Sequence, residues 1–578
     1  MTTTTIYTPH GALTPEVEKN LEAYEPLLRR LLNNRGLRDA LAAEQFLAPS
    51  YEEHLHDPFL FTDMAPAVER ILTAIKNDEH IAIYSDYDCD GIPGGVLLHD
   101  FFKSIEFTNF ENYIPHRHEE GYGFNVGAVT KLKENNVSLI ITVDCGIVDH
   151  AAASKAKEVG IDVIITDHHE PSDTLPDALA VINPKRDDAY PFSGLCGSGV
   201  AFKLVQALIQ KGKEQKIFEL NEGQEKWLLD LVGIATIADM VPLVGENRAL
   251  AHYGLAVLRK SRRPGLQQLL RTARMNQKFL TEDDIGFTIG PRINAASRMD
   301  DPEDAFHMLA TRDEAEAGAR VSHLEKLNNE RRGVVAAMTK EAKKRMKLIE
   351  DIPNVIVVGN PDWRPSLVGL AANSLAETYN RPVFVWGRDG QGIIKGSCRS
   401  GGEVSVVDLM REAEGAFVEA GGHHGAGGFT VEEHAVHTLG EMLEAAYLRT
   451  IEAKEDTPNE IFFDTDVTLG DVNYALQKTL ARLAPYGEGN AKPLFRFLDV
   501  VPSKVDIFGK TKEHTKMIFE REAGPLEAIM FFKKPEDFTV VPEAGKAHTL
   551  IAHIEESFFM GRKSTRLRIV DILESLGI

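Results

Sequence analysis

The stretch of sequence that decides the fold is Ile81-Ala82-Ile83-Tyr84-Ser85-Asp86-Tyr87-Asp88-Cys89-Asp90-Gly91. Its first four residues are β-rich, and three aspartates follow at alternate positions. Two more short β-rich runs, residues 139–143 and 163–166, come later with helical stretches between them. Strands that alternate with helices in this way are typical of a parallel sheet covered by helices on both faces. The sequence therefore predicts an α/β fold with a mostly parallel sheet.

Acidic and histidine side chains follow each of these predicted strands. Asp86, Asp88 and Asp90 follow the first strand, Asp144-Cys145-Gly146 the second, and Asp167-His168-His169 the third. The carboxyl ends of parallel strands open on one crevice, so we expect these side chains to converge there. Closely packed carboxylates repel one another unless a cation neutralises them. The pattern therefore indicates a metal site.

A fourth acidic position, Asp239, ends an apolar run that begins at Leu231. Imidazole and carboxylate ligands together suit Mn²⁺, Zn²⁺ or Fe²⁺, whereas carboxylates together with phosphate suit Mg²⁺ or Mn²⁺. Taken alone, the first motif also fits a calcium loop, and each motif fits a plain turn. Their order and their shared placement favour the metal site.

The rest of the chain divides by composition and periodicity. Leucines at helical spacing mark the start, and a polar stretch at residues 453–459 is typical of a linker. Five regions are predicted in chain order: an N-terminal helical segment (1–50), the parallel-sheet domain (51–300), a helical connector (301–350), a second α/β domain (351–452) and a small β-barrel domain (453–578).

The composition is that of a globular protein with several domains, since 578 residues exceed one ordinary core. The formal net charge is −23, but residues 491–578 carry 14 Lys+Arg and 13 Asp+Glu. Such an acidic body argues against a protein that coats nucleic acid, although it can hold a local basic groove. We expect no transmembrane span and no signal peptide. Four cysteines without a Cys-x-x-Cys pair fit a reducing cytoplasm.

The four acidic motifs, taken in order, resemble motifs I to IV of the DHH phosphoesterases. Flanking segments resemble the RecJ exonuclease branch of that superfamily, and the likeness extends from about residue 50 to the C-terminus. These segments are Tyr113-Ile114-Pro115, Glu119-Glu120-Gly121-Tyr122-Gly123, Gly197-Ser198-Gly199, Arg292-Ile293-Asn294-Ala295-Ala296, Gly421-Gly422-His423 and Leu483-Ala484-Pro485-Tyr486-Gly487.

Four positions depart from the pattern of that branch. Ser297 stands where glycine is common, and Arg364 and Ser366 stand where histidine and glycine are usual. Cys398 interrupts a segment that often carries glycine. None of the four is an expected metal ligand, so the departures bear on substrate details more than on chemistry.

The resemblance implies two divalent ions, Mn²⁺ or Mg²⁺, that activate a water for in-line attack on a phosphate. The implied ligands are Asp88, Asp90, Asp144, His168 and Asp239. His169 would contact the phosphate, while Asp86 either orients a ligand or simply forms the turn. The implied phosphate-binding residues are Arg117, Arg298, Ser397, Arg399 and His423. For each arginine, an ordinary surface role is the alternative.

The last domain resembles an oligonucleotide-binding (OB) barrel, with candidate contacts at Phe508, Lys510, Lys512, His514 and Lys516. The implied activity is 5′-to-3′ hydrolysis of single-stranded DNA to mononucleotides in DNA repair and recombination. The implied protein is a cytoplasmic monomer without a membrane partner, and single-strand-binding protein recruits it.

Two alternative functions stay open at this point. One is another DHH phosphodiesterase, acting on short oligoribonucleotides or cyclic dinucleotides. Such relatives are usually much shorter and lack the terminal barrel. The other is a non-catalytic DHH replication scaffold, which would have lost motif carboxylates that are intact here.

Overall fold

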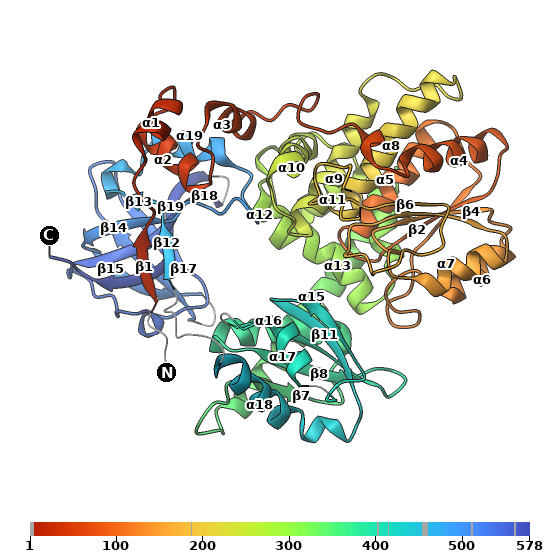
Figure 1. The fold of residues 1–578 in the computed structure, drawn as a ribbon. Coiled ribbons are helices and arrows are strands. Elements are labelled where there is room, and N and C mark those ends of the chain that lie inside the picture. Colours follow the sequence, from red (N-terminus) through yellow and green to blue (C-terminus); the bar gives the residue numbers. More distant parts are fainter. Residues whose placement is uncertain are drawn as a thin grey trace. The chain divides into compact units, whose positions relative to one another are not determined.

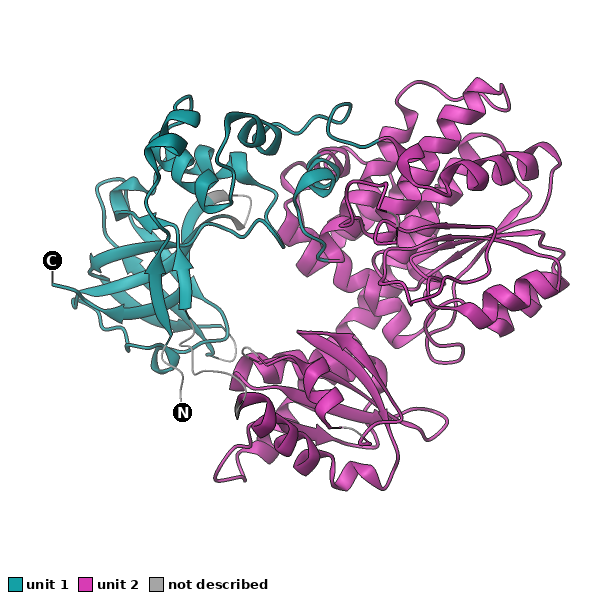
Figure 2. Cartoon of the chain, viewed as in Figure 1, with its two compact units in different colours: residues 1–56, 240–252, 457–578 teal, residues 57–239, 253–456 magenta. Residues whose placement is uncertain are grey.

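The computed structural model of the chain describes residues 5–186, 188–401, 404–413, 415–452, 460–509, 512–559 and 562–577. The chain forms two compact units (Figure 2). The larger unit contains residues 57–239 and 253–456, and the smaller unit contains residues 1–56, 240–252 and 457–578. The predicted linker at 453–459 and the candidate contact Lys510 lie outside the described residues.

A five-stranded parallel sheet in the larger unit confirms the predicted α/β domain (Figure 1). Its strand order is β3-β2-β4-β5-β6. The strands are β2 (Ile81–Ser85), β3 (Phe110–Tyr113), β4 (Leu139–Val143), β5 (Asp162–Thr166) and β6 (Ala180–Ile182). Every residue of β2 and β4 is buried, because helices cover both faces of the sheet.

Helices α5, α6 and α7 on the faces of this sheet come from the segments between its strands, whereas α8 follows the last strand (Figure 1). Helices α6 and α7 pack on one face, where Leu132 and Ala156 contact a core that includes Ile140 and Ile165. Helices α5 and α8 pack on the other face. The helices from residue 64 to residue 299 are α4 (Met64–Lys76), α5 (Gly91–Ser104), α6 (Val126–Glu134), α7 (His150–Glu158), α8 (Gly197–Glu214), α9 (Leu229–Ala238), α10 (Gly245–Leu258), α11 (Pro264–Thr272), α12 (Glu282–Asp284) and α13 (Gly290–Met299).

The predicted helical connector consists of α14 (Glu303–Ala310) and the 33-residue α15 (Glu314–Met346). The Asp313 side chain caps α15 by accepting a hydrogen bond from the Glu316 amide at 2.7 Å. Helix α15 first packs on α11, α13 and α14 and then packs on α16 through Met338, Ala342 and Met346. One long helix thus supports both α/β bodies of the larger unit.

A second sheet completes the larger unit, with the order β10-β11-β9-β8-β7. Only β7 and β8 are parallel, and the other neighbouring pairs are antiparallel. Its strands are β7 (Ile356–Gly359), β8 (Val383–Arg388), β9 (Ile394–Arg399), β10 (Glu419–His423) and β11 (Ala426–Val431). Its helices are α16 (Pro365–Tyr379), α17 (Val406–Glu412) and α18 (Leu439–Glu452). This is the second α/β domain that the sequence predicts.

The smaller unit contains a seven-stranded mixed sheet of order β13-β14-β18-β19-β17-β16-β15. Its strands are β13 (Thr465–Asp466), β14 (Phe495–Val500), β15 (Lys504–Phe508), β16 (His514–Phe519), β17 (Leu526–Met530), β18 (His548–Phe559) and β19 (Arg562–Glu574). Alternate residues of these strands, such as Phe497, Met517 and Leu567, face one common core.

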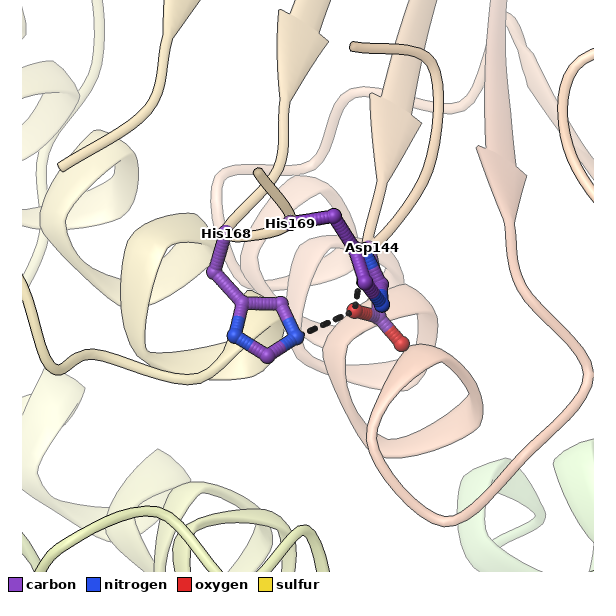
Figure 3. A group of neighbouring side chains, drawn as sticks. All are labelled: Asp144, His168 and His169. Atoms are coloured by element: carbon purple, nitrogen blue, oxygen red, sulfur yellow. Dashed lines mark ion pairs between the residues drawn. The ribbon is translucent and has the colours of Figure 1, made fainter. Parts of the chain in front are cut away.

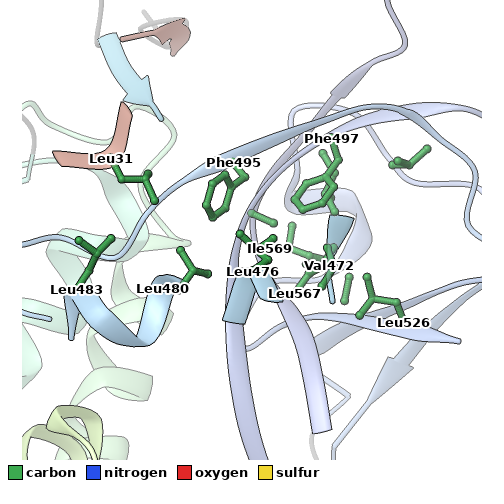
Figure 4. Close-up of a cluster of buried hydrophobic side chains, with 14 of the residues drawn as sticks. Leu31, Val472, Leu476, Leu480, Leu483, Phe495, Phe497, Leu526, Leu567 and Ile569 are labelled. Carbon is green, nitrogen blue, oxygen red and sulfur yellow. The ribbon is translucent and has the colours of Figure 1, made fainter. Parts of the chain in front are cut away.

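The N-terminal segment closes that core rather than standing apart. Its helices are α1 (Pro15–Asn20), α2 (Pro26–Asn34) and α3 (Ala40–Leu47), and α19 (Tyr474–Leu483) packs beside them. Leu31 lies with Leu480, Leu483 and Phe495 (Figure 4). The segment also holds a strand, β1 (Ile6–Pro9), in parallel with β12 (Glu460–Phe463). The sequence predicts only helices there, because the partner of β1 lies some 450 residues away along the chain.

A buried arginine fixes the segment that precedes strand β14 of the mixed sheet. Arg248 is 2% exposed, and its guanidinium donates hydrogen bonds to the carbonyl oxygens of Phe46, Ala484 and Pro485 at 2.9–3.0 Å. Its Cζ also lies 3.9 Å from the centroid of the Phe46 ring. The segment that begins at Leu483 thereby contributes buried carbonyl oxygens to the smaller unit.

Among the described residues, no helix has the length and apolar character needed to span a membrane.

The shared core gives a stability prediction for the smaller unit. Leu31→Ala removes a fully buried side chain, and we expect a loss of about 2–5 kcal/mol in unfolding free energy. The matched control is Leu41→Ala on α3, where the leucine is 65% exposed and the cost should stay below about 0.5 kcal/mol. Urea unfolding followed by circular dichroism measures both. Equal losses would mean that α2 does not belong to this core.

Candidate functional site

The aspartates after the strands are held by the sheet itself. The backbone amide of Asp86 donates to Val143 O at 3.0 Å, that of Asp144 to Thr166 O at 2.9 Å, and that of Asp167 to Ile182 O at 3.1 Å. Each of these bonds extends the backbone hydrogen bonding between neighbouring strands by one residue beyond the end of the strand. The parallel sheet therefore sets these three residues side by side at its carboxyl edge, as the sequence predicts.

The loop of the first motif is shaped by hydrogen bonds to its own carboxylates. Asp88 Oδ1 accepts from the backbone amides of Asp90 and Gly91 at 2.7 and 3.1 Å. The Asp90 carboxylate accepts from the amides of Gly197 and Ser198 at 2.6 and 2.7 Å. Those amides begin α8, where the positive end of the helix dipole favours an anion. The Gly197-Ser198-Gly199 segment thus fixes Asp90.

Asp144 adopts a left-handed backbone conformation, with φ of 63°. A Cβ atom at Gly197 would lie 2.5 Å from the Cβ of Asp144, so only glycine fits beside it. The two histidines that follow β5 lie next to Asp144 (Figure 3). The distance from Asp144 Oδ1 is 3.2 Å to His168 Nε2 and 3.9 Å to His169 Nδ1.

Asp167 positions both histidines, a role that the sequence did not assign to it. Its Oδ1 accepts from the amide of His168 at 2.7 Å and lies 2.7 Å from His169 Nδ1. A carboxylate only accepts, so Nδ1 of His169 carries the proton in this bond. Burial disfavours the charged imidazole, but the hydrogen bond and charge of Asp167 raise the pKa of His169. Burial lowers the pKa of His168, which favours the neutral ligand form.

Asp239 joins the cluster from the end of α9. Its Oδ2 lies 3.7 Å from His168 Nε2, as does Oδ2 of Asp90. The sequence-predicted ligands therefore come from four separate segments to one place. Three overlapping sets each offer ligand atoms within 4.8 Å of one another: Asp144, His168 and His169; Asp90, His168 and Asp239; and Asp86, Asp88 and Asp144.

The electrostatics of the cluster favour a cation. Burial, and then the charge of Asp88, raises the pKa of Asp86 well above its usual range. Burial, and then the charges of Asp90 and Asp88, raises the pKa of Asp144 in the same way and that of Asp239 to about 9. Oδ1 of Asp86 and Oδ1 of Asp144 are buried and accept no hydrogen bond. Carboxylate oxygens without donors beside a neutral imidazole fit a bound divalent cation.

A cleft of about 770 Å³ adjoins this cluster within the larger unit. The parallel-sheet domain contributes Tyr87, Arg117 and Tyr122 to its lining, and the second α/β domain contributes Arg364 and Ser397. The Tyr122 hydroxyl lies 3.4 Å from the His169 ring nitrogens. The cleft therefore begins next to His169 of the cluster.

The cleft lining has a small excess of cations, with Arg117, Arg364, Arg388 and Lys395 against Asp362, Asp389 and Glu419, and Arg298 lies nearby. Among the described residues, neither Arg117 nor Arg298 forms an ion pair, and Arg117 Cζ lies 4.8 Å from the Tyr87 ring centroid. Burial, and then the charges of Arg117 and Arg331, lowers the pKa of Arg298 to about 10. An anion in the cleft would relieve this repulsion. Arg298 Nη1 donates to Ser366 O at 2.8 Å, and Ser366 Oγ donates to Arg298 O at 2.9 Å.

The other predicted phosphate-binding residues do not all line the cleft. Ser397 lines the cleft, whereas Arg298, Arg399 and His423 are not among the described lining residues. Arg399 follows Ser397 on the same strand β9, and burial lowers its pKa. His423 lies exposed at the end of β10. The structure thus brings Arg117 and Ser397 to the cleft and leaves His423 beside it on the surface strand.

The four departures from the family pattern have different surroundings. Ser297 is buried within α13, and Cys398 is buried with its sulfur 4.0 Å from Met410 Sδ. Ser366 makes the reciprocal bonds with Arg298, and Arg364 lines the cleft. Asn294, inside a motif of unassigned role, accepts a hydrogen bond at Oδ1 from the Cys89 amide at 2.8 Å. Asn294 and Asp167 both lie within motifs that the sequence analysis noted, but only their hydrogen bonds in the structure show which residues they position.

A parallel sheet that carries an Asp/His cluster at its carboxyl edge, beside a cationic cleft, defines a DHH-type phosphoesterase domain. Three regions match known families by sequence. Residues 80–236 match the DHH family, N-terminal domain; residues 353–448 match the DHHA1 domain; and residues 463–571 match the RecJ OB domain. The last match confirms the predicted OB domain.

The chain is similar over most of its length to proteins named single-stranded-DNA-specific exonuclease RecJ. It is 36% identical to the Bacillus subtilis protein, over 94% of this chain and 68% of that protein. It is 32% identical to the Salmonella typhimurium protein, over 95% of this chain and 96% of that protein. The crystal structure of RecJ in complex with Mn²⁺ from Thermus thermophilus has a TM-score of 0.81 and 28% identity, over 99% of this chain and 81% of that chain. The chain belongs to the RecJ family.

The shifted carboxyl groups predict how metal affects stability. Without metal, Asp239 keeps its proton in the folded state up to about pH 9, whereas the unfolded chain releases it near its ordinary pKa of 3.8. Stability without metal should therefore fall as the pH rises between these values. Mn²⁺ needs ionised ligands, so it should raise the melting temperature more at pH 8 than at pH 6.

Thermal melting of the full chain with EDTA or Mn²⁺ measures this effect. Asp239→Asn should remove much of the pH dependence and most of the Mn²⁺ shift. The control is Asp300→Asn, because Asp300, Asp304 and His323 form the one ligand-type group outside the cluster among the described residues. An Mn²⁺ shift that is lost in Asp300→Asn and kept in Asp239→Asn would place the metal elsewhere.

Proposed function

We propose that this chain is a 5′-to-3′ exonuclease that hydrolyses single-stranded DNA to mononucleotides with Mn²⁺ or Mg²⁺, in DNA repair and recombination. The observation that carries the proposal is the carboxylate and histidine cluster beside the unpaired arginines of the cleft. A metal cluster next to a cationic cleft suits a phosphodiester substrate. Membership of the RecJ family over most of the chain supports single-stranded DNA as that substrate.

Each residue of the cluster receives a role in this proposal. The residues that hold two divalent ions are Asp88, Asp90, Asp144, His168 and Asp239. When bound, such ions activate water and neutralise charge on the scissile phosphate. Asp86 orients the cluster from behind Asp88, because its buried carboxylate lies within ligand distance of Asp88 and Asp144. His169, whose Nδ1 is occupied by Asp167, keeps Nε2 for a phosphate oxygen.

The cleft residues hold the strand in this proposal. Arg117 and Arg298 bind phosphate oxygens, for which a guanidinium offers paired donors. Ser397, Arg399 and His423 of the second α/β domain contact the strand from the other side. Arg298 also links the two domains through Ser366, so its position depends on both.

The alternative functions fit these observations less well. A hydrolase of short oligoribonucleotides or cyclic dinucleotides has no evident use for the OB domain at residues 463–571. A non-catalytic scaffold has no evident use for a complete ligand set with donor-free carboxylate oxygens. We further propose a cytoplasmic monomer that single-strand-binding protein recruits, and four unpaired cysteines support the reducing compartment. Light scattering with and without that protein tests the last two points.

The ligand assignment predicts loss of catalysis from single changes. Asp144→Ala and His168→Ala should each lower turnover below about a tenth of the wild-type value, because each removes one ligand from the charged cluster. His80→Ala is the matched control, since His80 precedes β2 at the opposite edge of the same sheet. The assay follows Mn²⁺-dependent digestion of 5′-labelled single-stranded DNA, with circular dichroism to verify folding. A well-folded His168→Ala enzyme with near-normal turnover would remove His168 from the ligand set.

The proposal also predicts polarity and strand preference. Labelled mononucleotide should appear at once from a 5′-labelled single strand and only late from a 3′-labelled one. A blunt duplex should resist digestion, because the cleft between two domains admits one strand. Gel analysis of the two labelled single strands and of the labelled blunt duplex measures this. Early release of the 3′ label, or equal digestion of the blunt duplex, would contradict the proposal.

A further inference from the structure

A second pocket opens in the larger unit and shares no lining residue with the cleft. Its volume is about 350 Å³, which is within the range of small-molecule sites. Phe101 of α5, Ile209 of α8 and Trp227 of the 3₁₀-helix η2 (Gln224–Leu228) form part of its apolar wall. Asp230 of α9 also lines it, and we call this cavity the α9 pocket.

The α9 pocket lies at the opposite ends of two helices from the carboxylate and histidine cluster. Helix α5 begins directly after Asp90 of the cluster, and Phe101 in its last turn lines the pocket. Helix α9 holds Asp230 of the pocket in its first turn and ends before Asp239 of the cluster. Nine residues at the helical rise separate these two aspartates by about 14 Å. The α9 pocket is therefore a separate site, and a ligand there leaves the cluster free.

Paired charges fix the buried part of the α9 pocket in one arrangement. Arg263 is 4% exposed, and its guanidinium donates to Asp100 Oδ2 at 2.6 Å and to Asp230 Oδ2 at 2.9 Å. Ser261 Oγ donates to the same oxygen of Asp230 at 2.7 Å, and Arg312 Nη2 donates to Asp100 Oδ2 at 2.9 Å. This polar wall is thus held in place before any ligand arrives, which reduces the entropy lost on binding.

Three side chains of the lining stand outside this network. Trp227 is 50% exposed, so half of a large flat ring faces solvent. Glu225 and Arg262 form no ion pair and no hydrogen bond among the described residues. The charges of the lining balance, with Arg262, Arg263 and Arg312 against Asp100, Glu225 and Asp230. A neutral, flat ligand with both donors and acceptors on its edge therefore suits this pocket better than an ion.

Guanine has the chemistry that these three side chains complement. Its face stacks on an aromatic ring, and its O6 and N7 accept two hydrogen bonds from a guanidinium. Its N1–H and its exocyclic amine are adjacent donors, which the two oxygens of a carboxylate accept together. Adenine has no second donor beside its amine, and cytosine and thymine offer a smaller face. The set of one indole, one carboxylate and one guanidinium therefore favours guanine over the other bases.

We propose that the α9 pocket binds the guanine base of a free nucleoside or nucleotide. Trp227 stacks on the base, Glu225 accepts from its two donors, and Arg262 donates to its two acceptors. A pocket of about 350 Å³ holds one nucleoside and not a strand. The proposal goes beyond the proposed nuclease function and does not rest on it.

Calorimetric titration of guanosine and of guanosine monophosphate into the full chain in EDTA tests the site. The two ligands should bind with similar Kd, because the balanced lining offers the phosphate no surplus of positive charge. Trp227→Ala should raise Kd between about fivefold and about a hundredfold through the loss of stacking, whereas Trp227→Phe should keep most of the affinity. Phe287→Ala is the matched control, since Phe287 is an 80% exposed aromatic residue of the same unit outside the pocket, and its Kd should not change.

A second variant tests the choice of base without removing the ring. The wild type should bind guanosine at least about fivefold more tightly than adenosine. Glu225→Gln should lose guanosine affinity and gain adenosine affinity, because a carboxamide pairs with adenine and accepts only one of the two guanine donors. Glu222→Gln is the matched control, because Glu222 is exposed three residues earlier and does not line the pocket. Circular dichroism verifies that each variant is folded.

The outcomes separate this site from the cleft and from the nuclease activity. The proposal is overturned if guanosine at about 1 mM does not bind, or if the wild type binds guanosine and adenosine equally. It is also overturned if Arg117→Ala in the cleft abolishes binding while Trp227→Ala does not, since the nucleoside then occupies the cleft. A chain that binds guanosine as stated but cuts no DNA keeps the α9 pocket and loses the proposed nuclease function.

Discussion

Mutual repulsion among buried carboxylates is the constraint on which the rest of the larger unit depends. Asp86 and Asp144 lie close together at one sheet edge, beside Asp88 and Asp90, and burial and like charge raise the pKa of Asp86 and of Asp144. The fold holds them there with backbone bonds, from the ladder of the sheet and from the first turn of α8. These backbone bonds satisfy some of the carboxylate oxygens and leave others without a hydrogen-bond donor. A divalent cation fits the oxygens that have no donor.

The opposite problem occurs at the neighbouring cleft, where Arg117 and Arg298 form no ion pair among the described residues. Arg117 and Arg298 repel each other as the aspartates do, and burial strengthens the effect. An anionic substrate that binds a metal on one side and guanidinium groups on the other relieves both imbalances. Helix α15 supports this arrangement, because one rigid element packs on both domains that line the cleft. The site therefore combines two groups of like charge, one of aspartates and one of arginines.

In the smaller unit, segments that are far apart in the sequence together form one apolar core. The mixed sheet leaves a face that α2, α3 and α19 cover, and Arg248 satisfies buried carbonyl oxygens at its edge. Its outer face carries aromatic and basic side chains instead. One sheet thus carries a buried apolar core on one face and aromatic and basic side chains on the other.

The sequence by itself determined the parallel sheet and the order of the acidic motifs, because period, apolar runs and motif spacing are local properties. The candidate ligand residues came from the resemblance of those motifs to a known family. It also indicated the connector and the terminal β domain. Only the tertiary structure decided that Asp167 anchors His169, that Gly197 and Ser198 bind Asp90, and that β1 pairs with β12. It alone brought Phe532 to His514. Some of those contacts join residues far apart in the chain, and in others a residue has several possible partners nearby. A local sequence pattern predicts neither the distant partner nor which nearby partner is used.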